Sequence, residues 1–159
     1  MKKKKDPNNR IVIGMKCTIK GDSGEFVSID VLNYDNPNSP DVDDANWLAC
    51  NINLSISPFQ AKIKASLRTE DFVQFANSVE RLRQLPTSKV AVFETMEEWL
   101  TIEIEKDKLG KLIINGLARD VDKSNGSSLK FAFCSDQTYL KPLLSEINSI
   151  INKFPVREK

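Results

Sequence analysis

The sequence predicts an α+β protein: an antiparallel sheet or sheets of about eight strands and two amphipathic helices, ordered four strands, helix, four strands, helix. Two observations support this fold class. Apolar and polar residues alternate along successive short runs, as expected for strands with one face in water. Twice, a group of such runs precedes a segment whose apolar residues recur at helical spacing. Strands linked by short turns, with a helix after each group, favour antiparallel sheet covered by helices.

The first half of the chain carries four strand-like runs and one helical segment. The strands are expected at residues 15–19, 26–34, 48–56 and 59–67. The polar stretch 35–44 contains two prolines, and neither helix nor strand is expected there. In the helical segment that follows, Thr69 is the expected N-cap and Pro86 marks the end.

The second half repeats this order without a residue-level repeat. Strands are expected at residues 89–95, 99–105, 111–119 and 129–135. The last helix carries an apolar stripe from Leu140 to Phe154. Pro142 must lie in its first turn, because only the first-turn positions tolerate a missing N–H group.

Length and charge predict the domain organisation. A chain of 159 residues is typical of a single domain, expected here over residues 11–155. Residues 1–10 carry four lysines, Arg10 and Asp6, a sum of +4, and are predicted to be a disordered basic tail. Residues 156–159 are expected to be a C-terminal tail. Because the whole chain has a net charge of +1, the remainder is near −3, which does not favour direct nucleic-acid binding.

The composition excludes several kinds of chemistry. Histidine is absent, which removes the usual Ser-His-Asp and Cys-His mechanisms and His-rich zinc sites. We therefore expect no enzymatic activity, no cofactor and no metal ion. The three cysteines each lie in a strand-like run and are expected to be buried free thiols in a reducing compartment. No run approaches the roughly 20 apolar residues of a spanning helix, so we expect no membrane contact and a cytoplasmic location.

Two tryptophans and an acidic loop are the candidate contacts for a partner. Trp47 and Trp99 each fall in phase with the polar residues of a strand, and exposed aromatic side chains are frequent binding anchors. The alternative is that each tryptophan covers a sheet edge or the loop above it. The acidic residues that precede Trp47, and that we group with the tryptophans as predicted contacts, are Asp41, Asp43 and Asp44.

Three short motifs resemble those of the WapI-type immunity proteins of bacteria. They are Asp44-Ala-Asn-Trp-Leu48 after an acidic turn, Thr69-Glu-Asp-Phe72 at a helix start, and Asp136-Gln-Thr-Tyr-Leu140 at the last helix. The resemblance spans roughly residues 15–155. It implies a non-enzymatic antitoxin that binds the C-terminal domain of a toxin inside kin cells. It also suggests structural roles, with Asp136 capping the last helix and Asn46 ordering the loop before Trp47.

The resemblance and the charge pattern together give the first hypothesis, an immunity protein that binds and neutralises a cognate toxin. Many such toxins are nucleases with basic clefts, and an acidic inhibitor captures a basic partner faster through electrostatic steering. The alternative hypothesis is a small-ligand-binding α+β module of unknown ligand, whose sheet and helix enclose an apolar pocket. A filled interior between helix and sheet counts against that alternative.

Overall fold

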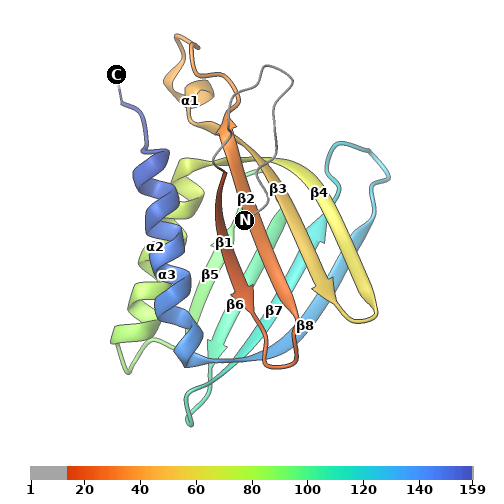
Figure 1. Ribbon diagram of the computed structural model, residues 1–159, viewed down its shortest axis with the longest axis vertical. Coiled ribbons are helices and arrows are strands. Elements are labelled where there is room, and N and C mark those ends of the chain that lie inside the picture. The colour runs from red at the N-terminus through yellow and green to blue at the C-terminus, as the bar shows by residue number, and fades with distance from the viewer. Residues whose placement is uncertain (1–13, 159) are drawn as a thin grey trace.

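A computed structural model describes residues 14–158, so the predicted basic tail at 1–10 lies outside the described residues. Figure 1 shows two four-stranded antiparallel sheets, with the two long helices side by side along one edge. Each sheet keeps its strands in chain order, β1-β2-β3-β4 and β5-β6-β7-β8. The α+β prediction, with its eight strands and two sizeable helices, is confirmed.

The elements lie close to their expected positions. The first sheet contains β1 (Met15–Lys20), β2 (Phe26–Tyr34), β3 (Trp47–Ile56) and β4 (Phe59–Arg68). The second contains β5 (Val90–Glu94), β6 (Leu100–Lys106), β7 (Lys111–Arg119) and β8 (Ser128–Asp136). The helices are α1 (Val42–Ala45), α2 (Thr69–Gln84) and α3 (Leu140–Lys153), with a single 3-10 turn, η1 (Gln137–Tyr139), before α3.

The two sheets and two long helices share one hydrophobic core. Helix α2 packs against β5, α3 packs against β1 of the other sheet, and the helices pack against each other. Phe93 of β5 lies between two phenylalanines of α2, with ring centroids 5.8 Å from Phe72 and 4.8 Å from Phe75. Because the last helix is fixed to the first strand, the halves of the chain form a single packed unit.

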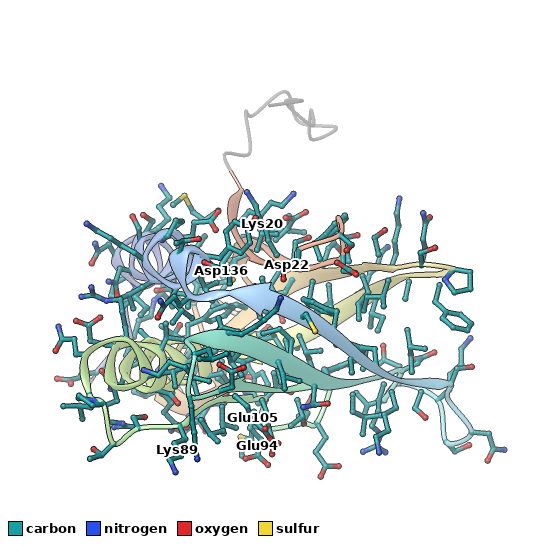
Figure 2. All side chains as sticks on the ribbon, turned by 90° about the horizontal axis from the view of Figure 1, so that it is seen from below. Lys20, Asp22, Lys89, Glu94, Glu105 and Asp136 are labelled. Atoms are coloured by element: carbon teal, nitrogen blue, oxygen red, sulfur yellow. The ribbon has the colours of Figure 1, made fainter. Side chains whose placement is uncertain are left out.

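The turn between β1 and β2 joins the two sheets near the start of α3. The amide of Asp22 donates to the carbonyl of Cys134 at 2.9 Å, and the Ser135 hydroxyl donates to the Lys20 carbonyl. Asp22 also lies 3.6 Å from the Lys111 ammonium. Figure 2 shows Lys20 and Asp22 of the first sheet beside Asp136 at the end of β8. The helices and this junction leave the edges formed by β4 and β8 open.

Three local predictions are corrected. The polar stretch contains the short helix α1, because Asp41 accepts hydrogen bonds from the amides that open it. The N-cap of α2 is Arg68 rather than Thr69, and Asp71 accepts the Arg68 amide at 2.9 Å. Cys17 and Cys50 are buried, but Cys134 is exposed, since it lies on the outward face of β8. The placement of Pro142 in the first turn of the last helix is confirmed.

Candidate partner-binding surface

Arg68, at the end of β4, joins four segments at one end of the molecule. It is the register partner of Trp47 at the start of β3, and its guanidinium carbon lies 5.9 Å from the Trp47 ring centroid. Its Nη2 is 3.6 Å from Oδ1 of Asp43 in α1 and 3.2 Å from Oε1 of Glu70 in α2. Its Nη1 is 3.2 Å from Sδ of Met96, in the turn between β5 and β6. One cation at the end of β4 therefore contacts β3, α1, α2 and that turn.

The three predicted aspartates of the loop have different roles. Asp41 caps α1, since its Oδ1 accepts the amide of Asp43 at 2.9 Å. Asp44 accepts the side-chain amide of Asn36 at 3.0 Å, which closes the loop from within. The side chain of Asp43 is 88% exposed. The carboxylate of Asp43 is therefore largely open to solvent.

Asn46 and Arg157 fix this loop to the C-terminal end of the chain. The side-chain amide of Asn46 donates to the Val42 carbonyl at 2.9 Å and to the Arg157 carbonyl at 3.0 Å, while its Oδ1 accepts the Arg157 amide at 2.7 Å. The Arg157 guanidinium carbon lies 3.8 Å from the Tyr34 ring centroid. The expected ordering role of Asn46 is confirmed. Arg157, inside the stretch predicted as a tail, is anchored, and Figure 1 shows α1 and the C-terminus at the same end.

The β5–β6 turn supplies residues that the sequence reasoning did not group with the loop. Met96 is 63% exposed, and the neighbouring Glu97 and Glu98 are exposed carboxylates. Glu98 adopts a positive φ of 59°, and its carboxylate accepts a hydrogen bond from Arg119 Nη1 at 2.8 Å. Neither Arg68 nor Met96 belongs to a motif. The register between β3 and β4 brings Arg68 beside Trp47, and the packing of the β5–β6 turn brings Met96 beside Arg68.

The two tryptophans differ in exposure. Trp47 lies on the half-buried polar face of β3, as predicted. Trp99 does not: it is 3% exposed, it precedes β6, which begins at Leu100, and its side chain belongs to the hydrophobic core. Its Nε1 donates to Glu97 Oε2 at 3.3 Å. The prediction that Trp99 lies on an exposed strand face is therefore wrong, and its side chain is covered.

These residues define a surface that we call the acidic crest. It combines the carboxylates of α1 and of the β5–β6 turn around Arg68, with Trp47 and Met96 as its apolar members. The carboxylates of the acidic crest are Asp41, Asp43, Asp44, Glu97 and Glu98. An aromatic and a thioether side chain surrounded by carboxylates is suited to contact with a basic protein surface.

The titratable groups beneath the acidic crest are structural. Burial raises the pKa of Asp71, although the Arg68 amide and guanidinium partly offset this effect. Burial also raises the pKa of the Cys17 thiol to about 12 and that of Cys50 well above its ordinary value. Such thiols are not nucleophiles at neutral pH. Within residues 14–158, no group of three His, Cys, Asp or Glu side chains is placed to hold a metal ion.

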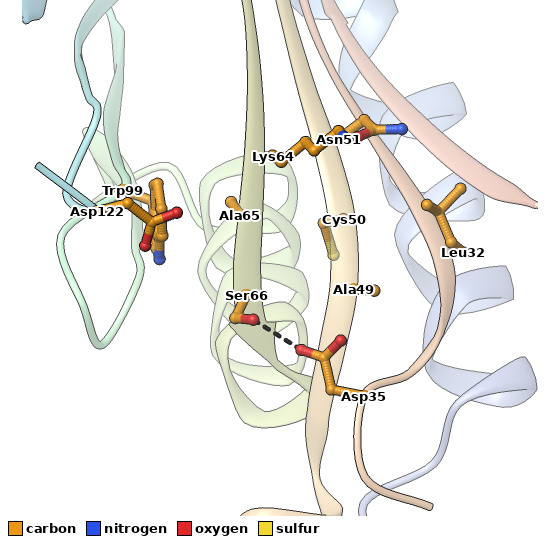
Figure 3. Close-up of a pocket in the computed structure, with 10 residues that line it drawn as sticks. All are labelled: Leu32, Asp35, Ala49, Cys50, Asn51, Lys64, Ala65, Ser66, Trp99 and Asp122. Atoms are coloured by element: carbon orange, nitrogen blue, oxygen red, sulfur yellow. Dashed lines mark hydrogen bonds between the residues drawn. The ribbon is translucent and has the colours of Figure 1, made fainter.

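Open hollows lie between β4 and β8, over the strands of the first sheet, and beside the β6–β7 turn. One of about 560 Å³ runs between β4 and β8, with Phe59 and Leu129 on its two sides. Another, of about 510 Å³, is shown in Figure 3, where the Ser66 hydroxyl donates to Asp35 at 2.6 Å and Trp99 lies across the β4 edge. A small pocket where the start of α3 meets the strands has a volume of about 10 Å³, about the room that one water needs. No helix of the described residues is long and apolar enough to cross a membrane.

The fold and this surface define a class: two antiparallel four-stranded sheets with two long helices, carrying an acidic crest at one end. Residues 18–155 match the Immunity protein WapI-like family, and the chain belongs to that family. This confirms the resemblance seen in the sequence. Among solved structures, the chain is similar to one described as crystal structures of Trypanosoma bruciei MRP1/MRP2, at 8% identity and a TM-score of 0.42, with 91% of this chain and 89% of that chain covered. No curated protein matches it.

Proposed function

We propose that this protein is a non-enzymatic immunity protein that binds the C-terminal domain of a cognate bacterial toxin and neutralises it. The observation that carries the proposal is the family match over residues 18–155, which spans both sheets and both long helices. The toxin is delivered to neighbouring cells, so the immunity protein acts in the cytoplasm of the cells that make it.

The acidic crest supports the choice of contact surface and the kind of partner. Of its predicted contacts, Asp43 and Trp47 remain accessible beside Met96, whereas Trp99 is covered and is left out. Asp41 and Asp44 contribute negative charge while they hold the loop in shape. A basic toxin domain, such as that of a nuclease, complements this surface, and the carboxylates increase the rate of association.

The experiment pairs this protein with the toxin domain encoded by the neighbouring gene. Co-expression is expected to rescue cells that the toxin domain alone kills, and the purified proteins are expected to co-elute in size-exclusion chromatography. Cell death despite co-expression, together with no association of the purified proteins, would overturn the proposal.

A pair of substitutions with the same charge change tests the acidic crest itself. Met96→Lys places a cation among the carboxylates and is expected to weaken toxin binding at least about tenfold. Leu109→Lys is the matched control, because Leu109 is 92% exposed in the β6–β7 turn, away from the acidic crest. Equal affinities of the two variants would place the contact surface elsewhere.

The small-ligand alternative receives less support. A pocket between helix and sheet is expected for this alternative, but the one found at the start of α3 holds only about 10 Å³. The larger hollow of about 560 Å³ between β4 and β8 has a volume within the usual range of ligand sites, but it lies open at the sheet edges. Thermal-shift screening of metabolites with the purified protein tests this alternative, and a reproducible stabilisation by one compound class would favour it.

A further inference from the structure

We propose that the outward face of the second sheet is a docking surface for a basic protein domain that also presents apolar side chains. This inference rests on the proposed function, since the occupant is the toxin domain itself, and it extends the interface beyond the acidic crest. The surface, which we call the β5–β7 face, consists of outward residues on three neighbouring strands. They are Val90, Val92, Glu94, Glu103, Glu105 and Ile113, with Leu117 completing the apolar set.

The first observation is an excess of exposed apolar side chains. The outward face of an antiparallel sheet usually carries polar residues. Four aliphatic side chains on the β5–β7 face nevertheless expose 37% to 42% of their area: Val90, Val92, Ile113 and Leu117. The outward face of the first sheet carries mainly lysine, asparagine and serine, represented by Lys16, Asn51, Asn53, Ser55, Lys62 and Lys64. A set of neighbouring exposed aliphatic residues indicates an interaction site.

The second observation is the negative charge beside Val90, Val92 and Ile113, whereas Leu117 has Lys130 of β8 as a register partner. The strand register places Glu105 between Val90 and Ile113, and it places Glu103 beside Val92. Figure 2 shows Glu94 and Glu105 together on the side of the second sheet that faces away from the first. Within residues 14–158, none of the three glutamates forms an ion pair. Three unpaired carboxylates among aliphatic groups complement a partner that offers lysine or arginine around apolar contacts.

An exposed cysteine thiol next to the β5–β7 face can report whether a partner covers that face. Cys134 of β8 is the register partner of Ile113 and is exposed, whereas Cys17 and Cys50 are buried. A partner bound to the β5–β7 face covers Cys134. Because this thiol is native, its rate of alkylation measures contact in the wild-type complex and no mutation is needed.

The main experiment combines this footprint with two variants. In the complex with the toxin domain encoded by the neighbouring gene, Cys134 is expected to react with N-ethylmaleimide at least about tenfold more slowly than in the free protein. Val92→Thr combined with Ile113→Thr, which removes apolar surface at constant charge, is expected to weaken binding about tenfold. Leu109→Thr is the control of equal charge and is expected to bind as tightly as wild type. Glu103→Lys combined with Glu105→Lys is expected to weaken binding further.

The outcomes separate this inference from the proposed function. If the wild type binds the toxin domain while Cys134 stays reactive and the paired threonine variant binds normally, the inference is wrong and the proposed function stands. If the wild type does not bind, both fall. Protection of Cys134 in the protein alone, with a dimer seen by analytical ultracentrifugation, would mean that a second copy occupies the face and would also overturn the inference.

Discussion

Asn46 and Arg157 exchange two hydrogen bonds although 111 residues separate them in the chain. The side chain of Asn46 pairs with the backbone of Arg157 much as a neighbouring strand would, with distances of 3.0 and 2.7 Å. A third bond ties the same amide to the carbonyl of Val42 in α1. A single buried side chain thus joins the loop before β3 to the segment after α3. The acidic crest depends on this junction for its shape.

Replacing Asn46 by alanine is expected to destabilise the protein. The variant loses three hydrogen bonds at a residue that is 1% exposed, and it leaves backbone groups of Arg157 without their partner. We expect the free energy of unfolding to fall by about 2 to 3 kcal/mol in urea titrations. Asn53→Ala, on the outward face of β3, is the control and is expected to change it by less than about 0.5 kcal/mol. Equal effects would mean that the junction is not a major source of stability.

Asp71 is expected to give stability a distinctive pH dependence. Burial raises its pKa above the ordinary value of 3.8, so the folded protein retains a proton that the unfolded chain loses. This contribution to stability is present below pH 3.8 and is lost as the pH rises through the raised pKa. Asp71→Asn keeps an acceptor for the Arg68 amide and removes the loss of stability that occurs when the Asp71 carboxyl ionises. Relative to wild type, the variant should gain stability between about pH 3.5 and pH 7 in urea titrations.

Asp136 is expected to show the opposite sign. Its carboxylate accepts the amide of Thr138 at 2.9 Å, so Asp136 caps the 3-10 turn η1 before the last helix and not α3 itself, whose N-cap is Tyr139. This hydrogen bond lowers the pKa of Asp136 below 3.8. The stabilisation is present above pH 3.8 and is lost as the pH falls through the lowered pKa. Asp136→Asn should therefore be less stable than wild type at neutral pH and approach it in acid. If Asp71→Asn and Asp136→Asn changed the free energy of unfolding in the same direction at neutral pH, the opposite pKa shifts assigned to the two aspartates would be contradicted.

The cysteines are expected to react in two classes. Cys134 is exposed, whereas Cys17 and Cys50 are buried and have raised pKa values. Iodoacetamide at neutral pH should add one group to the folded protein and three after unfolding, as measured by intact-mass spectrometry. The Cys134→Ser variant should add none while folded. A second fast addition to the folded wild type would show that one of the inner thiols is accessible.

Gly116→Ala tests a close approach between β7 and β8. Gly116 lies opposite Phe131 in the register, and a Cβ atom there would be 2.1 Å from the Phe131 ring. Since β7 and the ring are both held in the core, we expect a loss of about 1 to 3 kcal/mol in unfolding free energy. Gly14→Ala is the control, because its nearest neighbour would be at an ordinary 3.6 Å. A neutral Gly116 variant would mean that the ring has room to move.

The order of the elements was predictable because it depends on local periodicity. The alternation along β3, for example, separates buried Leu48 and Ile52 from the half-buried Ala49 and Asn51, and this separation follows from the pleat alone. The capping role of Asp136 was partly predictable, because its hydrogen bond spans two residues, although Asp136 caps η1 rather than the last helix. The exact ends of the elements were less predictable. Helix α2, for example, has Arg68 as its N-cap instead of Thr69, and the Arg68 amide donates to Asp71.

The composition of the acidic crest was only partly predictable. The aspartates and Trp47 are neighbours in sequence, so their grouping required no tertiary information. Met96 reaches the same surface only because the β5–β6 turn packs against the end of β4, where Arg68 contacts its sulfur. Trp99 shows the opposite case. Its phase with Thr101 predicts an exposed side chain, but the strand starts one residue later and the indole is buried in the core.

Periodicity and residue type act over short distances, so they were enough to predict the strands, the helices and the lack of histidine chemistry. Which faces meet and which stay open depends on how these elements pack in three dimensions. The pairing of α3 with β1 and of α2 with β5 seals one side, while the outward glutamates and aliphatic residues of the second sheet stay exposed. Burial is a property of packed elements, and two strands with the same alternation differ in exposure according to what covers them.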